Sequence, residues 1–268
     1  MTRSLLRLAV LGAALTLEFA PPAAAEATEL LPDIDPIAPT GLAVQVSGEG
    51  GARRFRIGFV SRAGNVGAGP LIVRGHRADL FEPQMVADQV ISLSDGSTET
   101  NPGIGMLEYV EAETHEHWHL LRFMTYELRR AGDFKLVEPD QKTGFCLGDR
   151  YDVDPLVKLS GEPDQRVYST SCGPGQRELL EIEEGISVGW GDVYEAWRDA
   201  QYLDVTGLPA GAYVLVHRVN PGRSMRESRY SNNASSALIS LTWPRGRDRK
   251  PRARVLASCP ESGRCRAP

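Results

Sequence analysis

The sequence predicts an all-β fold, a β-sandwich with long loops. Short runs in which apolar and polar residues alternate recur along the chain, and Gly, Pro, Asn and Asp separate them. Successive side chains on a strand point to opposite faces, so this alternation indicates strands half buried against a core. No long amphipathic helical pattern and no internal repeat is present. Many short strands with turn residues between them favour two packed sheets.

The expected strands follow the chain in order. Phe55, Ile57 and Phe59 alternate with Arg or Gly and predict an early strand. Further strands are expected at 71–73, 90–93, 115–121 continuing towards 123–128, 202–206, 213–219 and 237–243. Residues 151–186 are charged and poor in strand patterns, so they predict a long loop with a brief helix at 178–184.

Three of the five histidines lie in five consecutive positions, as His115, His117 and His119. On a strand, residues i, i+2 and i+4 share a face, so the three imidazoles would project together. Neutral imidazole binds copper and zinc, and three such ligands leave a coordination position open. The spacing therefore predicts a metal site but does not separate copper from zinc. Trp118 would point to the opposite face, into the core, and the isolated His76 and His217 are expected to be ordinary structural residues.

The charge of the chain is divided unevenly. The segment 245–268 carries eight Lys or Arg against two acidic residues, whereas residues 26–244 carry 20 basic against 32 acidic ones. An acidic body of about −12 fits cationic partners such as amines and argues against nucleic acid. The Arg- and Pro-rich segment 245–268 has no strand or helix pattern, so we expect a disordered tail.

The N-terminal residues 1–25 have the features of a signal peptide. Arg3 and Arg7 precede a short apolar run, and Ala23–Ala25 provide a small-residue cleavage site. The run is too short to span a bilayer, and no other stretch is apolar enough for a membrane span. The mature protein is therefore expected outside the cytoplasm, secreted to the extracellular space or to the cell envelope or periplasm.

Four cysteines suit an oxidising compartment and two disulfides. Three connectivities are possible. We favour Cys146–Cys172 and Cys259–Cys265, because the first two lie in the body and the last two in the tail. The GxSxG elbow, the Walker loop and HExxH are all absent, which removes the usual sequence support for a serine hydrolase, an NTPase or a zincin.

Five motifs together resemble the lysyl oxidases. In chain order they are the HxHxH run, KTGFCLGD at 142–149, DVY at 192–194, QYLDVT at 201–206, and VNP at 219–221 followed by ESRYSNN at 227–233. The resemblance covers about residues 31–243, and it is closer to the bacterial lysyl-oxidase-like branch, because Trp118 precedes the third histidine and most of the animal cysteines are missing. It implies a catalytic domain at 31–244 with a β-sandwich of lysyl-oxidase type.

The resemblance also implies roles for single residues. His115, His117 and His119 would bind copper, and Lys142 and Tyr194 would form the cross-linked lysine tyrosylquinone cofactor. Such an enzyme oxidises peptidyl lysine or other primary amines to aldehydes with O2, releasing ammonia and hydrogen peroxide. Animal members carry a further histidine where this chain has Thr125 or its neighbours, so another base is required, and Asp204 is the candidate.

Two other functions fit the same histidines. A non-catalytic, copper-binding extracellular β-sandwich would bind metal without forming a quinone, and it would be indifferent to Lys142→Ala. A hydrolytic zinc site would use the three imidazoles and a water, and its activity would survive Tyr194→Phe.

Overall fold

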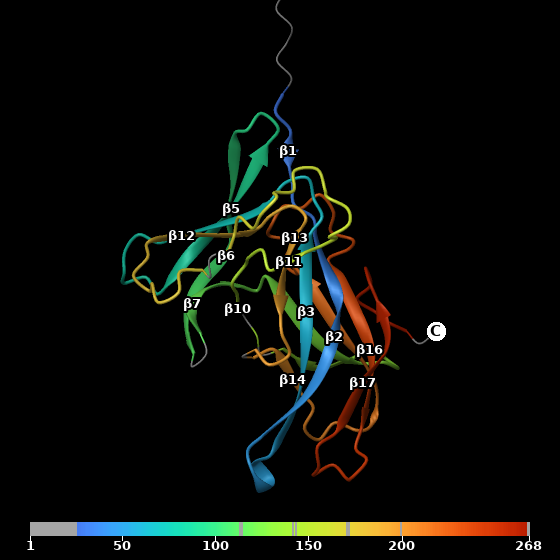
Figure 1. Ribbon diagram of the computed structural model, residues 1–268. Coiled ribbons are helices and arrows are strands. Elements are labelled where there is room, and N and C mark those ends of the chain that lie inside the picture. The colour runs from blue at the N-terminus through green and yellow to red at the C-terminus, as the bar shows by residue number, and fades with distance from the viewer. Residues whose placement is uncertain are drawn as a thin grey trace, which may run out of the picture.

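The computed structural model describes residues 26–112, 115–140, 142, 144–169, 172–198 and 200–266. Within these residues the regular elements are β-strands, apart from one short 3-10 helix at Gly50–Ala52. All the strand pairs in the described part are antiparallel. The predicted all-β class is therefore confirmed (Figure 1).

The first of three sheets carries the histidines. It has seven strands in the order β10-β7-β6-β5-β4-β12, with β1 paired to β5. Their bounds are β1 Glu29–Leu30, β4 Leu71–His76, β5 Gln84–Leu93, β6 Thr98–Ala112, β7 His115–Leu121, β10 Gly144–Phe145 and β12 Glu181–Ile186.

The other two sheets have five strands each. The second has the order β11-β13-β3-β14, with β2 paired to β3, and the third has the order β17-β16-β15-β8-β9. The strands of the second are β2 Ile34–Ser47, β3 Arg54–Asn65, β11 Tyr151–Asp152, β13 Trp190–Tyr194 and β14 Tyr202–Asp204. Those of the third are β8 Met124–Arg130, β9 Leu136–Pro139, β15 Gly211–Val219, β16 Ala234–Thr242 and β17 Arg252–Cys259.

The second and third sheets pack against each other as a sandwich. Strand β2 lies against β15, β16 and β17, and the two layers face each other in Figure 1. One large apolar cluster extends from this interface into the first sheet, with Phe59, Tyr126 and Trp118 among its largest buried side chains. The three sheets therefore share a core.

The structure corrects the expected strand through residues 115–128. The chain leaves the first sheet after β7 and enters the third with β8. Arg122, between them, adopts a left-handed backbone with φ of 60°. A strand cannot continue through that conformation, which side chains other than glycine rarely adopt. The turn has no Gly or Pro to mark it in the sequence.

Two further expectations are wrong. Residues 178–184 do not form a helix, because Glu181–Ile186 is strand β12 and pairs with the edge strand β4. The tail is not disordered throughout, since Arg252–Cys259 is strand β17 and pairs with β16. In both segments the neighbouring strand supplies backbone hydrogen-bond partners, which outweigh the local preferences of a charged sequence.

The favoured disulfides are both present, as Cys146–Cys172 and Cys259–Cys265. The expected signal peptide, 1–25, lies outside the described residues. In the part of the chain that the structure describes, no helix has the length and apolar character needed to cross a membrane.

Candidate metal and cofactor site

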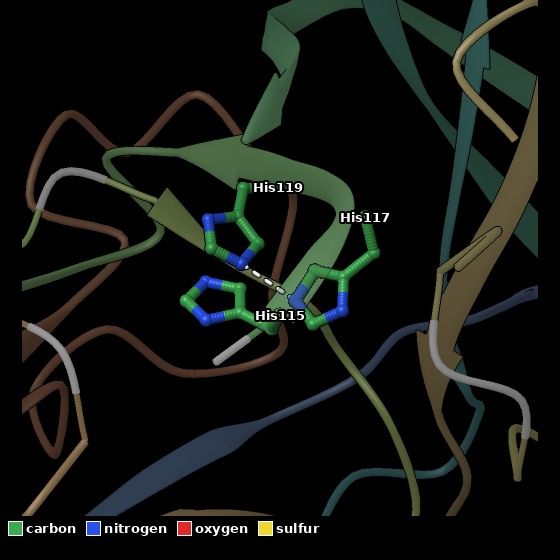
Figure 2. Close-up of side chains that lie close together, drawn as sticks. All are labelled: His115, His117 and His119. Atoms are coloured by element: carbon green, nitrogen blue, oxygen red, sulfur yellow. Dashed lines mark hydrogen bonds between the residues drawn. The ribbon is translucent and has the colours of Figure 1, made fainter. Parts of the chain in front are cut away.

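The three clustered histidines project from one face of β7. Their ring centroids lie 4.7 to 5.2 Å apart, and their nearest ligand nitrogens fall within 4.8 Å of one another. Nε2 of His117 is 2.8 Å from Nε2 of His119, and Figure 2 shows the three rings converging. Trp118 points to the opposite face and is fully buried. The strand prediction for this cluster is confirmed.

Burial keeps the imidazoles of His117 and His119 neutral. It lowers the pKa of His117 to about 4, with help from the charges of His115 and Lys142. The pKa of His119 falls to about 2, first through burial and then through His117 and Lys142. A neutral imidazole has a lone pair available for a metal at pH 7. The donor set therefore fits a copper or zinc ion at neutral pH without competition from protons at these two rings.

Strand β10 covers the most buried of the three rings. Gly144 pairs with Leu121 of β7, two residues beyond His119. A Cβ placed on Gly144 would lie 2.7 Å from the Cβ of His119 and 3.1 Å from its Nδ1. Real Cβ atoms do not approach so closely, so glycine is required where the two strands meet. The glycine of the KTGFC motif thus fixes the position of His119.

The histidines line a cavity of about 350 Å³ together with Lys142, Asp192 and Tyr194. Lys142 precedes β10, whereas Asp192 and Tyr194 lie two residues apart on β13. Nζ of Lys142 is 4.8 Å from the centroid of the Tyr194 ring. The structure therefore brings the predicted lysine and tyrosine together, even though the long segment between β10 and β13 separates them in sequence.

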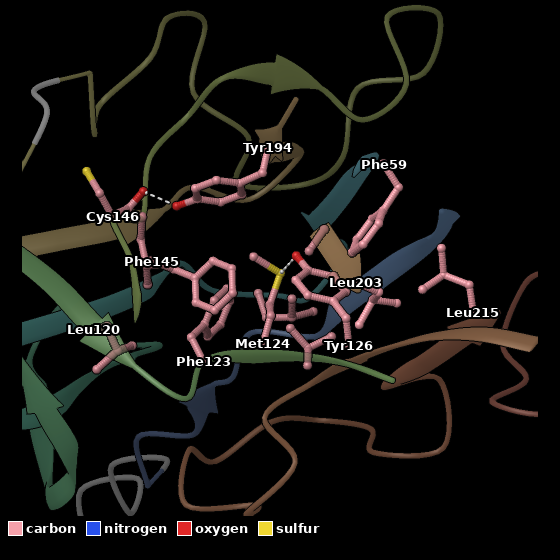
Figure 3. Packing of buried hydrophobic residues seen from close by; sticks show 14 of the residues in the cluster. Phe59, Leu120, Phe123, Met124, Tyr126, Phe145, Cys146, Tyr194, Leu203 and Leu215 are labelled. Atoms are coloured by element: carbon pink, nitrogen blue, oxygen red, sulfur yellow. Dashed lines mark hydrogen bonds between the residues drawn. The ribbon is translucent and has the colours of Figure 1, made fainter. Parts of the chain in front are cut away.

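The Tyr194 ring is fixed by the core behind the cavity. Its hydroxyl donates to the carbonyl oxygen of Cys146 at 2.8 Å, and Phe145 packs edge-on against it at 5.2 Å (Figure 3). Phe145 also contacts Tyr126 of β8, which in turn packs against Phe59 of β3. A chain of packed side chains from all three sheets thus supports the ring.

The Cys146–Cys172 disulfide ties the long loop to the cavity. The carbonyl of Cys172 accepts a hydrogen bond from the backbone of Trp118 at 2.9 Å, which places the loop beside β7. Pro174, two residues further on, lines the cavity. The loop therefore forms one wall of the site.

Comparison with known proteins agrees with this geometry. The sequence model described as lysyl oxidase matches residues 86–245, more than half of the chain. The chain belongs to the lysyl oxidase family. The proposed bacterial branch stays a prediction.

The curated relatives of this lysyl oxidase family member are distant. Protein-lysine 6-oxidase of Sus scrofa is 29% identical over 171 residues, covering 62% of this chain and 58% of the pig protein. Lysyl oxidase homolog 2 of Gallus gallus is 29% identical over 141 residues, and homolog 2A of Danio rerio is 30% identical over 139. Each of these two alignments covers 52% of this chain, but only 16% of the chicken and 17% of the zebrafish protein. The chain thus spans only part of the length of these relatives.

The structure does not bring Asp204 to the cavity. This residue ends β14, and its carboxylate accepts a hydrogen bond from the backbone of Thr206 at 2.8 Å. It does not line the cavity. Asp204 is therefore not among the predicted site residues that the structure brings together at the cavity, and its role as the base stays a prediction.

Asp192 is the site residue that sequence reasoning missed. Its side chain is 2% exposed and lines the cavity. Burial raises the pKa of Asp192 to about 7, against the opposing effects of Arg150 and of hydrogen bonds from Val193 and Tyr194. The DVY motif contained the signal, because residues 192 and 194 must share a strand face, but the motif was interpreted through its tyrosine alone.

The two remaining histidines are structural, as expected. Nε2 of His76 lies 3.1 Å from the carboxylate of Asp88 on the surface. His217 is buried, with Nδ1 3.2 Å from the Ile37 carbonyl and its ring against Tyr126. Neither lies near the cavity lining.

Proposed function

We propose that this chain is a copper-dependent amine oxidase that acts on primary amines, including the lysine side chains of proteins. One amine, one O2 and one water yield one aldehyde, one ammonia and one hydrogen peroxide. The observation that carries the proposal is the 4.8 Å distance between Lys142 Nζ and the Tyr194 ring, in a cavity shared with three converging imidazoles. The names of the relatives from pig and chicken support the same activity.

The histidines supply the metal ligands. His115, His117 and His119 would hold copper. When bound there, copper would supply one-electron redox chemistry beside the Tyr194 ring. A zinc ion has no such redox chemistry, so the presence of an oxidisable phenol beside the imidazoles favours copper.

Lys142 and Tyr194 supply the organic cofactor. Oxidation of the phenol ring by one O2 adds one oxygen atom and releases water. Bonding of Lys142 Nζ to a ring carbon, followed by loss of two electrons and two protons to a second O2, gives the cross-linked quinone and hydrogen peroxide. The hydrogen bond from Tyr194 to Cys146 and the edge of Phe145 hold the ring in place for Nζ.

The rest of the chain favours an amine substrate and export. The acidic body attracts cations over long range, and this raises the concentration of protonated amines near the surface. Two disulfides fit an oxidising compartment, in agreement with the proposed signal peptide at 1–25.

The proposal is tested by loading purified protein with copper in air and measuring hydrogen peroxide and aldehyde from a primary amine. We expect turnover in the wild type and none in Lys142→Ala or Tyr194→Phe. Lys158→Ala is the matched control, because Lys158 forms a surface ion pair with Asp164 away from the cavity. Copper binding without turnover in the wild type would favour the non-catalytic copper-binding module, and ester hydrolysis that survives Tyr194→Phe would favour a zinc hydrolase.

A further inference from the structure

Asp192 is a buried carboxylate with an incomplete set of partners. Oδ1 accepts the backbone N–H of Val193 at 2.9 Å, and Nε of Arg150 lies 4.0 Å away. Oδ2 is buried and has no hydrogen-bond partner among the residues that the structure describes. A buried carboxylate oxygen without a hydrogen-bond partner lowers the stability of the folded protein. The presence of Asp192 at this position therefore points to a role other than stabilising the fold.

The carboxylate lies beside the groups that must lose protons. Asp192 and Tyr194 share one face of β13, and both line the cavity with Lys142. The Tyr194 hydroxyl donates to the Cys146 carbonyl. Burial, and then the charge of the nearby Asp192 carboxylate, raise the pKa of Tyr194. Asp192 is therefore a second possible acceptor in the cavity that contains the phenol.

No other carboxylate in the described lining has this position. Glu116 lines the cavity, but it is exposed and points away from the face of β7 that bears the histidines. Glu184 on β12 is buried near Asp192, where burial and the Asp192 charge hold its pKa well above the ordinary value. Glu184 does not line the cavity, which leaves Asp192 as the buried carboxylate beside Tyr194 and Lys142.

Resting on the proposed function, we propose that Asp192 is the proton acceptor of the site and takes the hydroxyl proton of Tyr194 during cofactor formation. The O–H bond of Tyr194 breaks and a new O–H bond forms on the Asp192 carboxylate, which leaves a phenolate whose ring gives electrons to O2. One oxygen atom of O2 bonds to the ring. The other leaves as water with the proton from Asp192 and the hydrogen displaced from the ring carbon, and the carboxylate is restored.

Charged and titratable groups on the neighbouring elements surround the Asp192 carboxyl, and several of them change its pKa. Arg150 and Lys142, which flank β10, favour the ionised carboxylate. Glu184 of β12 opposes ionisation, and three tyrosines also face the group, Tyr126 of β8, Tyr151 of β11 and Tyr194 of β13. With a pKa of about 7, the carboxyl both takes up and releases a proton near neutral pH.

The test follows the quinone absorbance after copper is added, under air, to metal-free full-length protein. We expect Asp192→Asn to bind one copper as the wild type does but to form the quinone about a hundredfold more slowly. Asp192→Glu should restore part of the rate, because the carboxylate is retained. Asp164→Asn, the same substitution at a surface carboxylate that pairs with Lys158 away from the cavity, should leave the rate unchanged.

The outcomes separate this inference from the proposed function. No quinone in the copper-loaded wild type overturns the proposed function itself. Quinone formation in Asp192→Asn within about twofold of the wild-type rate overturns only the role of Asp192. If Asp192→Asn fails to bind copper, the pH dependence of quinone formation in the wild type provides the test. We expect the rate of quinone formation to rise between about pH 6 and 8, as the Asp192 carboxyl loses its proton. A rate that does not change with pH in this range would contradict the role of Asp192.

Discussion

Burial decides the protonation state of the residues in this cavity. It keeps His117 and His119 neutral, as metal ligands must be, and it brings the pKa of Asp192 to about 7. The same desolvation acts in opposite directions on the two residue types, because it always disfavours the charged form. The same burial therefore suits both the proposed metal ligands and the proposed proton acceptor.

The raised pKa of Asp192 predicts a cost in stability at high pH. The carboxyl titrates near pH 4 in the unfolded chain and near 7 in the folded one, so the folded state binds the proton more tightly. The contribution of the Asp192 carboxyl to the free energy of unfolding is fully present below about pH 4. It is lost as the pH rises from about 4 to 7, and it does not change further above that range. Asp192→Asn should therefore be more stable than the wild type at pH 8, by up to about 4 kcal/mol.

Denaturant unfolding of metal-free protein at pH 4.5 and pH 8 measures this difference. We expect the stability advantage of Asp192→Asn to grow with pH. An advantage that is equal at both pH values, or that shrinks at pH 8, would show that the carboxyl is not held protonated by burial.

Gly144 provides a second prediction at the level of single residues. Gly144→Ala places a methyl group against the Cβ of His119, so β10 or β7 must shift. We expect a loss of about 1–3 kcal/mol in stability and weaker copper binding. Gly132→Ala is the control, since a Cβ there meets nothing within 4 Å. Calorimetric copper titration of the two variants makes the comparison, and an unchanged affinity in Gly144→Ala would contradict the described contact.

At the level of elements, short strands and one disulfide bring the site together. Strand β10 has only two residues, yet Lys142 precedes it and Cys146 follows it. The disulfide from Cys146 to Cys172 then holds the long loop against β7. This arrangement explains how a lysine and a tyrosine separated by a long insertion meet in one cavity.

Removal of this disulfide should affect both stability and the cofactor. The double variant Cys146→Ser, Cys172→Ser opens a loop of 26 residues, which corresponds to about 3–4 kcal/mol of lost stability. We expect a lower melting temperature and slower quinone formation, because the Cys146 carbonyl and the loop wall both move. The Cys259→Ser, Cys265→Ser variant is the control, since it opens a loop of only 6 residues away from the cavity. Equal rates of quinone formation in the two double variants would contradict a role of the first disulfide in the site.

The sequence was most informative where local pattern and tertiary structure agree. Alternation predicted β3, β15 and β16, and the spacing of the histidines predicted their shared face. It failed at β12 and β17, where a neighbouring strand in the fold decides the conformation of a charged segment. Pairing partners far away along the chain cannot be deduced from local composition.

At the scale of the whole molecule, the site lies where three sheets meet. Four of the five residues of the predicted metal and cofactor set lie on strands of two sheets, and Lys142 lies just before β10. The core beneath them extends into the third sheet. Sequence motifs identified those five residues, but only the fold reveals that Asp192 lies in the cavity and Asp204 does not. A motif gives residue types in order, whereas the identity of a base depends on burial and distance.

The central claim is that Lys142 and Tyr194 form a cofactor with copper and O2, and peptide mass mapping tests it most directly. The protein is loaded with copper in air and digested, and the peptides that contain the two residues are compared with those of protein kept metal-free. We predict one cross-linked peptide with the mass of both, plus one oxygen atom and minus four hydrogen atoms. Two intact, unlinked peptides after aerobic copper loading would contradict the account and leave a copper-binding module.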